Sequence, residues 1–170
     1  RLNVPGIWSD KAMTKGGDFI RLDLDGRGFK GEIGAPRIPV IRKWIQVPYG
    51  AEIDLSRIVS NEKEMQLDEI KPGMQLVPVQ PPVPKIPGAA ERIPFEMDRS
   101  IYAENDFIFE DYINILDEGY MRGRRIVVME FMPVQYNPAK NVIRYVDTIE
   151  VELTFKDADQ TKTIERMKRY

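Results

Sequence analysis

The strongest constraint on the fold is a pair of strand-like runs within residues 119–155. Residues 126–132 are apolar at nearly every position, as is typical of a strand covered on both faces. Residues 148–155 alternate between apolar and polar side chains, which indicates a strand with one face on a core and the other in water. Two prolines and two asparagines lie between the runs, at 133–141, and predict a turn. We therefore expect the two runs to form a long antiparallel hairpin.

The rest of the chain has the pattern of short strands and turns that is typical of an all-β protein. No stretch before the C-terminal tail shows a convincing helical period. Short strand-like runs separated by proline and glycine turns predict an antiparallel β-sandwich, jelly-roll-like, with strands expected at 19–24, 51–59, around 65–67, and at 74–79. In residues 34–48 the prolines indicate an edge strand or the start of a strand.

The length of the chain suits one domain. Its 170 residues, 42% of them hydrophobic, can bury one substantial core but leave little room for a second. We expect a β-sandwich domain at 1–156 and a polar tail at 157–170, either a short exposed helix or a mobile segment. Because the chain begins without methionine, it resembles an excised or mature piece of a longer protein.

Composition excludes several kinds of chemistry. The chain has no histidine and no cysteine, which excludes a histidine-based triad, a cysteine nucleophile, the usual zinc sites and any disulfide. Its net charge of −2, with both signs mixed along the chain, argues against nucleic acid or an anionic membrane as a partner. We predict no catalytic residue, no cofactor and no bound metal. The main alternative is calcium, for which four acidic side chains are available: Glu104, Asp106, Glu110 and Asp111. Their spacing does not match an EF-hand loop.

A glycine pattern near the N-terminus invites a nucleotide-binding interpretation. Gly26, Gly28 and Gly31 have the order G-x-G-x-x-G. In a dinucleotide site that motif opens a helix, whereas here Pro36 and Pro39 occupy the place of the helix. We therefore reject this interpretation.

A proline-rich segment runs from residue 78 to residue 94 and holds six of the 13 prolines. Such a segment should stay extended or polyproline-like on the surface, because proline cannot donate to a sheet. Lys85 stands alone in it, between Pro84 and Ile86. Composition by itself indicates an ordinary solvated lysine.

Several motifs in order resemble a known family. Residues 34–41 and 45–48 look like the G-x-P-x-[LI]-P-[VI] motif of the N-terminal propeptides of gingipain-type cysteine peptidases. The segments 102–109, 122–123 and 133–138 and the strand that ends at Phe155 follow in the same order as in those propeptides. The resemblance covers most of the chain.

The resemblance implies a role that composition does not show. Such propeptides are β-sandwiches that precede a caspase-like catalytic domain, keep the zymogen latent and help it to fold. The implied partner is therefore the cognate cysteine peptidase, bound non-covalently after processing. Many relatives use type IX secretion, which implies passage through the periplasm and an extracellular or cell-surface destination.

The resemblance also implies an inhibitory residue. In the gingipain relatives a basic residue before an Ile-Pro-aromatic segment enters the S1 pocket, and here that segment is 93–95. We prefer Lys85, because the prolines around it lower the entropy lost on docking, and keep Arg92 as the alternative. Three basic residues near the C-terminus are the predicted processing sites: Arg166, Lys168 and Arg169.

Two rival functions remain at this point. The first is an accessory β-sandwich that binds glycan or protein through Trp8, Trp44 and the aromatic residues of 102–112. The second is a carboxylate hydrolase, which we disfavour because no paired acids stand in a recognisable motif.

Overall fold

The computed structural model describes residues 1–25, 28–109 and 111–168, the side chains of 57–60 excepted. Its strands are β1 (Leu2–Asn3), β2 (Trp8–Thr14), β3 (Gly17–Asp23), β4 (Gly28–Lys30), β5 (Ile38–Val47), β6 (Glu52–Ser60), β7 (Lys63–Gln66), β8 (Ile113–Met121), β9 (Arg124–Phe131), β10 (Val134–Asn137), β11 (Val142–Tyr145) and β12 (Thr148–Lys156). Its helices are α1 (Leu67–Ile70), α2 (Ala89–Arg92), α3 (Arg99–Tyr102) and α4 (Gln160–Lys168). None of the helices in this described part is long and apolar enough to span a membrane.

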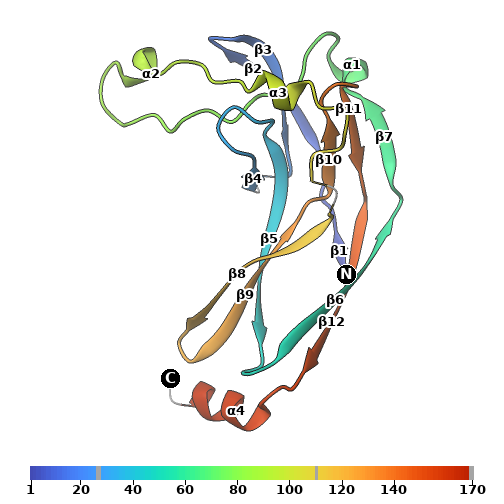
Figure 1. Ribbon diagram of the computed structural model, residues 1–170, viewed down its shortest axis with the longest axis vertical. Helices are drawn as coiled ribbons and strands as arrows, with labels where there is room; N and C mark the ends of the chain where they lie inside the picture. The colour runs from blue at the N-terminus through green and yellow to red at the C-terminus, as the bar shows by residue number, and fades with distance from the viewer. Residues whose placement is uncertain (26–27, 110, 169–170) are drawn as a thin grey trace.

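The strands form a long, curved antiparallel β-sandwich (Figure 1). In one half of the molecule the sheet β4-β5-β9-β8 faces the sheet β1-β12-β6. In the other half the β2-β3 hairpin faces the sheet β10-β11-β7. The expected fold class, an all-β antiparallel sandwich, is confirmed.

Each half has its own apolar core. The first core packs buried residues of β5 and β9, among them Ile41 and Met129, against Ile149 of β12. The second packs Ile20 and Leu22 of β3 against β10, β11 and α1, and the described side chains of Ile20 and Leu22 are fully buried. At roughly 1.5–3 kcal/mol for each large apolar side chain, this burial is the main favourable term for the fold.

The predicted hairpin between 126–132 and 148–155 is wrong. β9 pairs with β5 and β8, whereas β12 pairs with β1 and β6 in the opposite layer. Four residues of the expected turn form strand β10, and the tight turn comes at residues 138–141, where Asn141 has a positive φ of 54°. Pro133 separates β9 from β10, and its carbonyl accepts the Val146 N–H at the matching break between β11 and β12. The chain therefore leaves the sheet of β9 at the first break and enters the sheet of β12 at the second.

The individual strand patterns fit the structure better. Along β9, the residues from Ile126 to Phe131 are all buried or half-buried, as the apolar run predicts. Along β12, from Ile149 to Phe155, the apolar positions are buried or half-buried. The polar positions Glu152, Thr154 and Lys156 are exposed. Pro39 is the second residue of β5, which agrees with a proline near the start of a strand.

The structure also bears on two other predictions from the sequence, the strand at 74–79 and the glycine motif. Residues 74–79 do not form a regular strand but make isolated bridges, Leu76 with Ile20 and Val79 with Ile33. Gly28 begins strand β4, and no helix follows it, which agrees with rejecting a nucleotide loop. Gly26 lies outside the described residues.

One polar cluster is buried beside the first core. The side chain of Glu130 on β9 has no exposed surface, and its carboxylate lies 2.8 Å from Lys30 Nζ and 2.8 Å from Arg42 Nη2. Lys30 belongs to β4 and Arg42 to β5, so the triad joins three neighbouring strands. Both cations reach water, with side chains 28% and 41% exposed.

Candidate functional site

The proline-rich segment forms a wide loop at one end of the sandwich, beside the β2-β3 hairpin (Figure 1). Residues 82–88 are all exposed, and Val83 and Ile86 expose 52% and 61% of their surfaces. An apolar side chain that faces water on a projecting loop is available to a partner. The loop is therefore the candidate functional site.

Lys85 is the middle residue of the exposed stretch 82–88, which we call the tip of the loop, and the chain bends there. The Ile86 N–H donates to the Pro84 carbonyl at 2.9 Å, a three-residue turn centred on Lys85. Gly88 follows in the left-handed region, with φ of 73°, and leads into α2. The expectation of an extended chain throughout is therefore wrong beyond Pro84, because local turns take over. Within the described part of the chain, Lys85 makes no hydrogen bond, ion pair or ring contact.

Arg92, the alternative, occupies a different part of the loop. It ends α2, and the carbonyls around it are held by the domain. Lys15 Nζ, in the turn between β2 and β3, donates to the carbonyl oxygens of Ala90 at 2.7 Å, Glu91 at 3.0 Å and Ile93 at 2.7 Å. Arg92 thus lies within residues 90–93, which we call the anchored arm of the loop, whereas Lys85 lies at its free tip.

Further contacts close the base of the loop. Gln80 and Glu96 exchange two hydrogen bonds: Gln80 Nε2 donates to the Glu96 carbonyl at 2.7 Å, and the Glu96 N–H donates to Gln80 Oε1 at 3.0 Å. Phe95 stacks on Phe19 of β3, with ring centroids 5.6 Å apart. No local pattern marks Lys15 or Gln80. The carbonyls that Lys15 binds lie at least 75 residues away along the chain, and the partner of Gln80 lies 16 residues away.

The exit of the loop is fixed by a helix cap. The Asp98 N–H donates to the Gly34 carbonyl at 3.0 Å, and the Asp98 carboxylate caps α3. Hydrogen bonds from the Ser100 side chain and from the backbone N–H groups of Ser100 and Ile101 hold the pKa of this carboxyl below its usual range. The loop therefore leaves and rejoins a rigid frame.

The predicted processing residues Arg166 and Lys168 lie on α4, and Arg169 lies outside the described residues. The helix is tied to the sandwich through Tyr49, whose N–H donates to Thr163 Oγ1 at 2.9 Å and whose carbonyl accepts the Asp159 N–H at 2.8 Å. A peptidase needs an extended segment, so cleavage here requires α4 to unwind locally.

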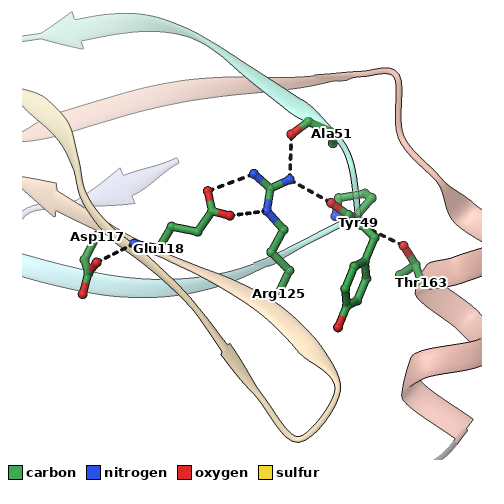
Figure 2. A network of polar contacts seen from close by, with 7 residues as sticks. Tyr49, Ala51, Asp117, Glu118, Arg125 and Thr163 are labelled. Carbon is green, nitrogen blue, oxygen red and sulfur yellow. Dashed lines mark hydrogen bonds and ion pairs between the residues drawn. The ribbon is translucent and has the colours of Figure 1, made fainter.

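Figure 2 shows the polar network beside this helix. The Arg125 guanidinium makes two hydrogen bonds to the Glu118 carboxylate, at 2.7 and 2.9 Å, and donates to the carbonyls of Pro48 and Ala51. The pKa of Glu118 is lowered mainly by its hydrogen bond from Arg125. This network joins the β8-β9 hairpin to the corner between β5 and β6 that carries α4.

The structure does not bring together the residues of the two alternative sites, the calcium candidates and the aromatic contact surface. Among the described residues no group of three acidic side chains is placed to hold a metal, and Glu110, one of the four calcium candidates, lies outside them. Of the other three, Asp106 accepts the Phe107 N–H. Tyr102 and Tyr112 are 6% and 5% exposed and belong to the interior, so they cannot form the expected contact surface with Trp8 and Trp44, which are exposed.

Comparison with known proteins agrees with this architecture. The structure of gingipain K from Porphyromonas gingivalis, which addresses its zymogenic latency, superposes with a TM-score of 0.80 and 31% identity, covering 92% of this chain and 85% of that one. The complex of the RgpB pro- and mature domains from the same species gives a TM-score of 0.75 at 19% identity, covering 92% and 78%. The second likeness shows the fold alone. The fold of this chain is therefore the one found in these two gingipain structures.

The sequence comparisons name the family. The Propeptide_C25 family model matches residues 11–169. Lys-gingipain from P. gingivalis strain ATCC 33277 and Lys-gingipain HG66 are each 33% identical over 153 residues. This chain therefore belongs to the gingipain propeptide family. The match covers 90% of the chain but only 9% of the length of those relatives.

Proposed function

We propose that this chain is the propeptide that keeps a secreted gingipain-like cysteine endopeptidase latent, and that Lys85 enters the S1 pocket of that enzyme. The observation that supports this most is the placement of Lys85: an unpartnered cation on the exposed tip of a loop whose base and one arm are fixed. The family and the gingipain K zymogen support the latency role. The partner is the catalytic domain of the same precursor, which stays bound non-covalently after processing.

The loop geometry favours Lys85 over Arg92. A side chain must project from its domain to reach the bottom of a pocket in another protein. Lys85 has exposed neighbours on both sides, whereas the carbonyls beside Arg92 are bound to Lys15. A loop that is ordered before docking loses less conformational entropy, which increases affinity.

The turn at Lys85 gives a physical reason for inhibition rather than hydrolysis. Peptidases bind the residues around the scissile bond in an extended form, and the Pro84 to Ile86 hydrogen bond opposes that form. Pro84 and Pro87 restrict the backbone on both sides. The Lys85–Ile86 bond is therefore a poor substrate even when the lysine fills S1.

The C-terminal segment completes the proposal. We assign 1–156 as the inhibitory and folding-assisting domain and 157–170 as the segment leading to the junction, with Arg166, Lys168 and Arg169 as processing sites. Export through the periplasm to the cell surface or medium follows from the same role.

The test is inhibition of the mature peptidase of this precursor by the 170-residue chain, with lysine and arginine reporter peptides. Lys85→Ala is expected to weaken inhibition at least tenfold, about 1.4 kcal/mol, whereas Arg92→Ala, the matched control, changes it little. Equal inhibition by Lys85→Ala and the wild type would remove Lys85 from S1. A folded wild-type domain that does not inhibit would refute the latency role.

A further inference from the structure

The side chain of Lys15 makes an unusual contact with the loop. An ammonium group has three N–H donors. All three are used on one short stretch, the carbonyls of Ala90, Glu91 and Ile93, at 2.7–3.0 Å. These carbonyls lie at the end of α2, where a helix leaves its last carbonyls without internal partners.

The residue next to Lys15 makes a second contact with the same arm. A Cβ at Gly16 would overlap the ring of Phe95, so the turn backbone packs directly on that ring. Phe95 also stacks on Phe19. The turn between β2 and β3 therefore supports the arm at two adjacent points, one polar and one aromatic.

We propose that Lys15 is a positioning residue for inhibition: it fixes the 90–93 arm of the loop and so presents Lys85 in one pose. This inference rests on the proposed function of the loop. With Lys15 in place, the free segment covers only the exposed residues 82–88, because Ala89 is 6% exposed. Without it, the segment free to move extends to the aromatic contact at Phe95, and more residues must be ordered on docking.

The position of Lys15 allows this role to be separated from stability. Lys15 is exposed and belongs to none of the described core clusters. Lys11 on the same hairpin is a matched control, because it too is exposed, and its 2.6 Å ion pair is to Asp18 rather than to the loop. Exposed ion pairs of that kind contribute little to stability.

The experiment compares Lys15→Met and Lys11→Met, alone and combined with Lys85→Ala, in the 170-residue chain. The first measurement is amide hydrogen exchange of residues 81–96 in the free domain. Lys15→Met is expected to speed exchange in this loop at least fivefold, while Lys11→Met and the core strands show no change. Unchanged loop exchange in Lys15→Met would overturn the inference without reference to any peptidase.

The second measurement is the inhibition constant against the mature peptidase. Lys15→Met is expected to weaken inhibition roughly tenfold. In the Lys85→Ala background the same change should have little further effect, since it acts through Lys85. Full additivity of the two effects would refute positioning. If Lys85→Ala alone has no effect, the proposed function fails, and the exchange result still decides whether Lys15 orders the loop.

Discussion

Replacing Glu130 with glutamine tests the energetic role of the buried triad. The substitution keeps the shape of the side chain but removes its charge, leaving Lys30 and Arg42 facing each other without a counter-ion. Breaking a buried ion pair by removing one partner costs about 3–5 kcal/mol. Because both cations are partly exposed, we expect the lower end, about 3 kcal/mol. For a domain of this size that corresponds to a fall of roughly 6–12 °C in the melting temperature.

The pH dependence of this difference has a definite sign. Burial alone would raise the pKa of Glu130, but the contacts and positive charges of Lys30 and Arg42 outweigh it and hold the pKa below its ordinary value of 4.5. A carboxyl with a lowered pKa in the folded state stabilises the protein fully above its unfolded pKa. That stabilisation is lost as the pH falls from about 4.5 through the folded value. The difference in the free energy of unfolding between the wild type and Glu130→Gln should therefore become smaller in acid.

Urea unfolding of both proteins at pH 7 and at a series of values below 4.5 measures this directly. In a Lys30→Met/Arg42→Met background the same substitution should be neutral or stabilising, because it then removes an unpaired buried charge. A cost under about 1 kcal/mol at pH 7, or a gap that does not narrow in acid, would contradict the assigned role of the triad.

Two further substitutions test single hydrogen bonds. Tyr102→Phe leaves the buried Leu76 carbonyl without the tyrosine hydroxyl that donates to it, and should cost about 1–3 kcal/mol in urea unfolding; no change would mean that the carbonyl finds another donor. Thr163→Val removes the acceptor of the Tyr49 N–H, so α4 should open more often, by about 1 kcal/mol or roughly fivefold. Trypsin cleavage after Arg166 should speed up by the same factor relative to Thr163→Ser, which keeps the hydroxyl; equal rates in the two variants would show that the hydroxyl does not hold the helix.

Local patterns in the sequence predict much of this fold. The alternation of residues 148–155 and the apolar run at 126–132 identify two strands, because burial of one face or of both imposes a period directly on the side chains. The pairing of those strands is not encoded in the same way. Pro133 reads equally well as the start of a tight turn or as a break at which a strand crosses into the other layer.

The same difference between local patterns and long-range contacts applies to the candidate site. Lys85 can be picked out from the sequence, since it is an isolated cation among prolines and the family resemblance suggests the role that we propose for it. The turn that presents it and the lysine that braces it cannot be found, because a hydrogen bond between residues 15 and 90 leaves no mark on either neighbourhood. The same holds for Tyr102, which looks like a surface aromatic in an acidic segment but is 6% exposed at the end of α3 and donates to the distant Leu76 carbonyl.

The position of β12 in its sheet affects when the chain can fold during synthesis. β12 lies between β1 and β6, so a strand near the end of the chain pairs with one at residues 2–3 and one at 52–60. During synthesis β1 and β6 cannot pair with β12 until about residue 156 has emerged. One side of the first core is therefore missing until then. Such long-range pairing makes folding slow and late. We therefore expect the nascent chain to stay open along most of its length, a state suited to passing through a narrow channel, and to close cooperatively only when its last strand arrives.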